Sequence, residues 1–337
     1  MFKIVKITVF PLLLLVLSNC EKVLPYAGED DDRLEINVLA DPDTTLSMYV
    51  FRTFSASEAK VTSMMMTDYW KYVLASNYNA DSLIRKDVVL SNAQAKVTVN
   101  GAEEHQLRYD PEKHNYTCGY RPKEGDMLRF EVTAVDYPPV AAEVSVPQAR
   151  RLEILGTRKF IDSKWTSGVH TEEGVIDWGT DTVMSITLRL TDPASERNYY
   201  RLKIRSAGEN RNETGELVYY SFSDVFSSSD VIFADENLIE GCWGWPANFS
   251  NIFDDRIFNG TSYTFTVESR QRFGDNTHVV VELQSITPEL YYYLKSIMLY
   301  RITDQDSYTE AIQIYSNVDN GWGIAGGISG EKQIIYF

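Results

Sequence analysis

Hydrophobic and polar residues alternate with a period of two in several stretches of the chain. In the first of them, Leu34, Ile36 and Val38 are separated by Glu35 and Asn37. Successive side chains of a strand point to opposite faces, so this alternation predicts a strand with one buried face. Similar stretches begin at Leu46, Ala95, Leu128, Val140, Met184, Tyr200, Tyr263 and Val279. The pattern therefore predicts an all-β protein.

Turn residues separate the predicted strands of the first half. Asn100-Gly101 is the favoured two-residue hairpin turn, because both residues tolerate positive φ. Short strands with turn signals between them are typical of an immunoglobulin-like β-sandwich, which we predict for residues 34–147. After a boundary at residues 147–151, we predict a second β-sandwich or barrel-like domain with one short helix over residues 148–337.

That helix has a clear start signal. Thr287 can cap it, Pro288 suits its first position, and Glu289 suits the dipole there. The residues that follow at helical spacing form one apolar stripe, which we expect to pack against the core: Leu290, Tyr293, Leu294, Ile297 and Met298.

Residues 63–84 interrupt the strand pattern. Tyr69, Trp70, Val73 and Leu74 have helical spacing, which indicates a short helix or a long inserted loop. Trp70 is a candidate contact for a ligand or partner, although such a residue more often closes the end of a core.

The first 20 residues have the features of an export signal. Lys3 and Lys6 precede an apolar run that ends in Leu17-Ser18-Asn19-Cys20. The run is about ten residues, whereas a membrane span needs roughly twenty. We predict that residues 1–19 are a lipoprotein signal peptide and that Cys20 is the lipidated first residue of the mature chain. The alternative is a signal peptide without lipidation. Residues 20–33, which include Glu29-Asp30-Asp31-Asp32, are predicted to be an acidic tether.

The net charge of −16 limits the classes of molecule that the chain can bind. Nucleic-acid binding needs a basic face, so we exclude nucleic acid as a partner. The same charge opposes adsorption to anionic lipid, which leaves the acyl chains of Cys20 as the membrane contact. Cys118 and Cys242 remain as either a disulfide pair or two separate buried thiols.

Motifs for metal or cofactor chemistry are missing from the sequence. The four histidines form no two-His helical motif, and the chain has neither Cys-x-x-Cys nor Gly-x-Ser-x-Gly. We therefore expect no metal, no cofactor and no catalytic residues.

A loop at residues 241–249 carries Trp243 and Trp245 between glycines. The two rings could form a stacking platform for a glycan or peptide, or they could fold beneath the loop as part of the core. We take both as candidate ligand contacts. Trp322 lies in a glycine-rich ending, where we expect a structural role because glycine lets backbones pass closely.

Four segments, taken together, resemble one known family. They are the lipobox with its sandwich strands, residues 254–260 leading into Tyr263, the helix that starts at residues 287–292, and residues 314–324. In this combination the chain resembles the Bacteroidota outer-membrane lipoprotein family that carries the domain of unknown function number 4249. The resemblance implies a lipid-anchored protein, exposed on the cell surface and often encoded beside TonB-dependent transporters. It implies no catalytic residues.

Three functions follow as hypotheses. The leading one is a noncatalytic accessory or ligand-binding component of a TonB-dependent nutrient-uptake system. Its partners would be the transporter, a SusD-like lipoprotein and a glycan or peptide ligand. The alternative is an adhesin or pilus-associated subunit that accepts a donated strand. A third is a hydrolase with a carboxylate pair from among Asp235, Glu236, Asp254 and Asp255.

Overall fold

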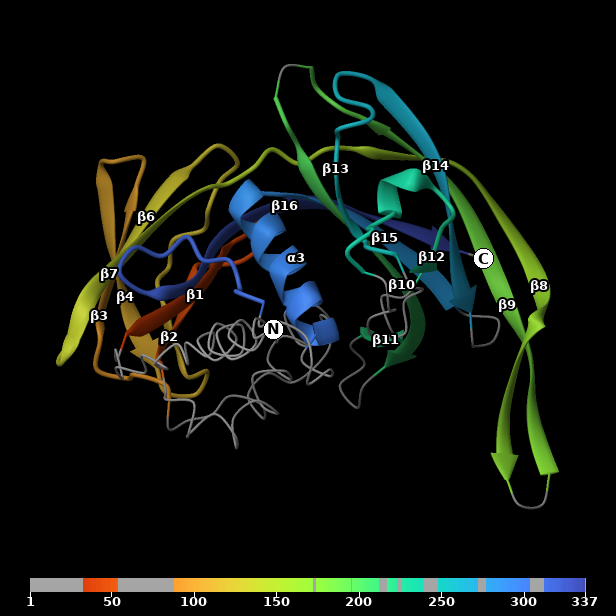
Figure 1. Cartoon of the computed structure of the whole chain (residues 1–337), viewed down its shortest axis with the longest axis horizontal. Coiled ribbons are helices and arrows are strands. Elements are labelled where there is room, and N and C mark those ends of the chain that lie inside the picture. Colours follow the sequence, from red (N-terminus) through yellow and green to blue (C-terminus); the bar gives the residue numbers. More distant parts are fainter. Residues whose placement is uncertain are drawn as a thin grey trace, which may run out of the picture.

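The computed structural model describes residues 33–53, 88–171, 174–194, 196–211, 217–222, 226–238, 248–271, 277–303 and 312–336. These residues confirm the predicted all-β fold, because most of them lie in strands and one long helix accompanies the sheets (Figure 1). Within these ranges, no helix combines the length and the apolar composition that a membrane crossing requires.

The first half forms a β-sandwich. Its strands are β1 (Leu34–Ala40), β2 (Ser47–Arg52), β3 (Gln94–Val99), β4 (Glu103–Asp110), β5 (Asn115–Thr117), β6 (Met127–Ala134) and β7 (Tyr137–Ser145). They are hydrogen-bonded in the order β1-β2-β5-β4-β3-β6-β7, with antiparallel neighbours throughout. The alternating apolar residues face inward, so Ile36, Val97 and Phe130 are fully buried in a common core.

The predicted hairpin turn is confirmed. Asn100 and Gly101 both have positive φ, 51° and 68°, between the antiparallel strands β3 and β4. The Asn100 side chain also ties the turn to a neighbouring one. Its Nδ2 donates to Asp126 Oδ1 at 3.0 Å, and its Oδ1 accepts from the Met127 N–H at 2.9 Å.

The second half packs a four-stranded sheet against a second group of strands. The sheet has the order β12-β14-β9-β8 and consists of β8 (Leu152–Thr171), β9 (Gly174–Thr191), β12 (Phe226–Ser227) and β14 (Ser262–Gln271). Opposite it lie β10 (Tyr199–Arg211), β11 (Leu217–Phe222), β13 (Ile252–Asp254) and β15 (Thr277–Ile286). Between them is a core rich in phenylalanine, in which Phe233 contacts the rings of Phe226, Phe249, Phe253 and Phe265.

The last strand, β16 (Trp322–Tyr336), connects the two halves. Residues 322–327 pair in parallel with β1, and residues 328–336 pair antiparallel with β15. One twelve-stranded sheet therefore runs through both halves, and β16 lies in it between β15 and β1, where the strands of the two halves meet (Figure 1). The domain boundary at residues 147–151 stays a prediction. The strand β16 pairs with β1, which precedes this boundary in the chain, and with β15, which follows it.

Glycines let β16 lie close to the backbones of neighbouring segments. Gly323 has a φ of +106°, and a Cβ there would collide with the carbonyl oxygen of Ile36 on β1. A Cβ on Gly327 would collide with the carbonyl oxygen of Ser145. The expectation that glycines in this ending permit close backbone approach is confirmed.

The helix α3 (Pro288–Thr303) packs against β16. Thr287 caps it as predicted, since its Oγ1 accepts from the Leu290 N–H at 3.4 Å. The predicted apolar stripe is buried and packs with Ile286, Ile324 and Tyr199. This packing places one end of α3 at the junction of the two halves.

Candidate functional site

The candidate lipidation and ligand-contact residues lie outside the described part of the chain. These are the lipidation site Cys20 and the three tryptophans Trp70, Trp243 and Trp245. The structure does place the two ends of the Trp243–Trp245 segment. The Asn248 N–H donates to the carbonyl oxygen of Leu238 at 2.5 Å, so the two residues that flank the segment lie next to each other.

Cys118 is a half-buried free thiol just after β5. Burial raises the pKa of this thiol, which favours its protonated, unreactive form. Cys242, the other member of the suggested pair, lies outside the described residues.

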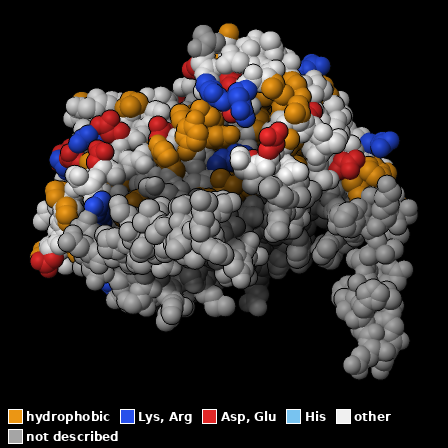
Figure 2. All heavy atoms as spheres, in the orientation of Figure 1, with side chains coloured by type: hydrophobic (Ala, Val, Ile, Leu, Met, Phe, Trp, Pro, Cys, Tyr) orange, Lys and Arg blue, Asp and Glu red, His pale blue; other side chains and the backbone are white. Residues whose placement is uncertain are grey.

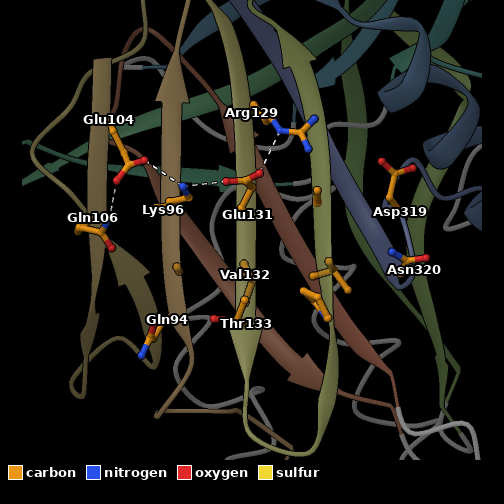
Figure 3. A pocket seen from close by; sticks show the side chains of 14 residues that line it. Gln94, Lys96, Glu104, Gln106, Arg129, Glu131, Val132, Thr133, Asp319 and Asn320 are labelled. Carbon is orange, nitrogen blue, oxygen red and sulfur yellow. Dashed lines mark hydrogen bonds and ion pairs between the residues drawn. The ribbon is translucent and has the colours of Figure 1, made fainter. Parts of the chain in front are cut away.

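A pocket of about 650 Å³ lies on the outer face of β3, β4, β6 and β7. Strand alternation creates its lining, because the residues between the buried ones point outward. Figure 3 shows Gln94, Lys96, Glu104, Glu131 and Thr133 side by side on three neighbouring strands. Asp319 and Asn320, which precede β16, form one wall.

Charged groups in this pocket are paired with one another (Figure 3). Lys96 Nζ lies 2.9 Å from Glu104 Oε2 and 3.0 Å from Glu131 Oε2. Arg129 reaches Glu131 at 3.2 Å and Glu143 at 2.6 Å. Hydrogen bonds from Lys96 and then Arg129 lower the pKa of Glu131, and bonds to Glu104 and Glu131 raise the pKa of Lys96. Both shifts move the pKa farther from pH 7, whereas an acid–base catalyst needs a pKa near the working pH.

Neutral polar groups complete the lining. Gln94 and Thr133 are opposite each other in the β3–β6 register, and both side chains are exposed. The wall is fixed in place, because the Asp319 N–H donates to the carbonyl oxygen of Ala141 at 2.8 Å. Amides and hydroxyls can both donate and accept hydrogen bonds, which suits a ligand with many hydroxyl groups.

The carboxylates of the hydrolase hypothesis have other partners. Asp254 is held by Arg197 and Arg256, each at 2.9 Å. Although burial opposes ionisation, hydrogen bonds from both arginines lower the pKa of Asp254. Asp255 is buried and accepts from the backbone N–H of Asn198 at 2.7 Å, and burial raises its pKa.

Residues 254–260 therefore fix one loop to another. The Asp255 carboxylate also accepts from Asn259 Nδ2 at 3.1 Å, and Asn259 Nδ2 donates to the carbonyl oxygen of Glu196 at 2.6 Å. These bonds hold the segment after β13 against the connection between β9 and β10. Asp235, the third carboxylate, forms an ion pair with Lys295 on α3 at 2.6 Å. Glu236 is exposed.

Sequence reasoning missed the pocket. Its polar residues were visible only as the outward positions of strands, and such positions are polar in most sandwiches. One signal was available, since Asp319 and Asn320 belong to the segment 314–324 that carried the family resemblance.

The chain is therefore an all-β protein in which one twelve-stranded sheet joins two sandwich-like halves and a polar pocket lies on one outer face. A family model, described as a domain of unknown function (DUF4249), matches residues 21–334. The chain belongs to this family. A search of curated proteins found no match.

Proposed function

We propose that the chain is a noncatalytic, surface-exposed outer-membrane lipoprotein that holds a polar ligand for a TonB-dependent nutrient-uptake system. The export signal with Cys20, the acidic residues 29–32 and the Bacteroidota resemblance support the location. A transporter and a SusD-like lipoprotein are the proposed partners.

The pocket on β3, β4, β6 and β7 is the observation that carries the binding function. Its side chains stand on a rigid sheet, so little ordering is needed when a ligand binds. Both of its cations, Lys96 and Arg129, are already ion-paired with glutamates, and its lining holds amide and hydroxyl groups as well. This combination favours a glycan over a charged peptide.

The adhesin or pilus alternative needs an exposed strand edge with unpaired backbone groups. At one edge, β7, Ala141 already exchanges two backbone hydrogen bonds with Asp319, so strand donation there would have to displace this pairing. The other edge strands of the described sheets are β11, β8 and β12, and the alternative would have to use one of them.

Replacing Gln94 and Thr133 together by alanine should weaken glycan binding about thirtyfold, because each of the two lost neutral hydrogen bonds contributes roughly 1 kcal/mol. The pocket's ion pairs stay intact in this variant. Calorimetric titration of the detergent-solubilised full-length protein with neutral oligosaccharides and short peptides measures the effect. Thr187→Ala, on β9 of the other sheet, is the matched control and should bind as the parent does. Unchanged affinity of the double variant, or no binding of any sugar by the parent, would count against the proposal.

A further inference from the structure

A second surface lies on different elements from the pocket. Figure 2 shows hydrophobic side chains gathered over the first turns of α3, with basic side chains beside them over β13. Tyr292 and Tyr315 are its exposed aromatic members, 46% and 36% exposed, and Ile257, next to Arg256 in the chain, is 55% exposed. They come from α3, from the segment before β16 and from the loop after β13, so the fold assembles this surface from distant parts of the chain. We call it the tyrosine–arginine surface.

The tyrosines support one another. The rings of Tyr292 and Tyr315 have centroids 5.8 Å apart at an interplanar angle of 44°. Beneath them, Tyr199 is buried, contacts the rings of Tyr291 and Tyr292, and places its hydroxyl 3.5 Å from that of Tyr292. Rings held in this way lose little conformational freedom when a ligand stacks on them.

Two arginines border the rings. Arg197 and Arg256 share one carboxylate, that of Asp254, whose side chain is only 5% exposed. Arg197 also lies over the ring of Tyr199, 5.8 Å from its centroid. The two guanidinium groups share the single carboxylate of Asp254, so neither has a carboxylate of its own among the described residues, although the buried carboxylate of Asp255 lies next to it in the chain. The side chains of Arg197 and Arg256 are 48% and 71% exposed, so N–H groups face solvent.

Charge and shape together indicate the ligand class. Glu289 lies near Tyr315, so an acidic group of a ligand is favoured beside Arg197 and Arg256 rather than beside Tyr315. A guanidinium binds a carboxylate through two parallel hydrogen bonds, and a tyrosine offers an apolar face with a polar tip. A sugar ring that carries a carboxylate satisfies both features. We propose that the tyrosine–arginine surface binds acidic oligosaccharides, with the sugar stacked on Tyr292 and Tyr315 and its carboxylate on Arg256.

Titrating the detergent-solubilised full-length protein with oligogalacturonate, and with the same oligomer after methyl esterification, tests this proposal. We expect the acidic form to bind at least about tenfold more tightly, because esterification removes one charge-assisted interaction. Tyr292→Ala and Arg256→Ala should each weaken binding of the acidic form about tenfold. The Tyr292 side chain is well exposed, and in Arg256→Ala the Asp254 carboxylate keeps its ion pair with Arg197, so neither variant should unfold the protein, which the thermal unfolding midpoint checks.

Matched controls are Arg189→Ala and Tyr336→Ala, since both side chains are also exposed and lie away from this surface. Neither should change binding. Equal affinity for acidic and esterified sugars, no binding of either, or affinity unaffected by both variants would overturn the proposal. So would selective binding of polyglutamate without oligogalacturonate, which would identify a peptide surface. The pocket variant Gln94→Ala with Thr133→Ala should leave this binding unchanged, which separates the two sites.

Discussion

Replacement of Gly323 by alanine is expected to unfold both halves of the protein together. The residue has a φ of +106°, a conformation that costs a non-glycine residue about 1–3 kcal/mol. The new Cβ would also collide with the backbone oxygen of Ile36, and overpacking of this kind adds about 1–3 kcal/mol. The total loss of about 2–6 kcal/mol is a large part of the stability of an ordinary domain.

The effect should not stay local, because β16 pairs with β1 in one half and with β15 in the other. Urea unfolding followed by circular dichroism measures the loss in stability, and hydrogen exchange shows which strands open. Gly156→Ala is the matched control, since φ is not positive there and a Cβ would meet nothing within 4 Å. A Gly323→Ala variant as stable as the control, or loss of protection in β1 and β2 alone, would contradict the proposed role of β16.

The second large effect is expected from Lys295→Met. Lys295 Nζ lies 2.6 Å from Asp235 Oδ2 and 2.8 Å from Ser250 Oγ, and the paired side chains are only 18% and 11% exposed. Removing the lysine leaves a partly buried carboxylate without its counter-charge, which costs about 3 kcal/mol. The double variant with Asp235→Asn should recover much of this loss. Lys332→Met breaks an exposed pair with Asp43 and should cost less than about 1 kcal/mol.

The pH dependence of this variant has a definite sign. Although burial opposes ionisation, the charge of Lys295 and its hydrogen bond lower the pKa of Asp235 below its ordinary value of 3.8. The stability that this pair contributes is present above pH 3.8 and is lost as the pH falls through the lowered pKa. In Lys295→Met the lowering effect of Lys295 is gone and burial, the largest influence, still raises the pKa of Asp235. The difference between the parent and the variant should therefore be largest at pH 7 and should shrink as the pH falls and the unpaired Asp235 takes up a proton. A difference independent of pH would show that the pair does not act through its charges.

Local patterns were sufficient to predict much of the fold. Alternation found the strands around Ile36, Val97 and Phe130, since each buries one face only. The helix was predicted because Thr287, Pro288 and its apolar stripe are all local signals.

The strand β16 could not be predicted in this way. Residues 323–327 are all buried and include three glycines, so no period-two pattern marks them. Its pairing with β1 also joins residues almost 300 positions apart, and no local signal specifies such a contact.

The pocket depends on this same long-range arrangement. Asp319 reaches the sheet only because the segment before β16 returns to β7, where it pairs with Ala141. The tyrosine–arginine surface likewise combines Arg197, Arg256, Tyr292 and Tyr315 from four segments of the chain. Single residues of both sites are unremarkable in the sequence, and the proposed binding depends on their being brought together by the fold.

The most direct test of the proposed function is the state of Cys20 in growing cells. Metabolic labelling with an alkyne-tagged palmitate should mark the native protein in the outer-membrane fraction, and external protease should digest it on intact cells. The Cys20→Ser variant should carry no label and should be lost from that fraction. An unacylated mature terminus, or native protein found free in the periplasm, would contradict the proposal that the chain is a lipid-anchored binding protein of the cell surface.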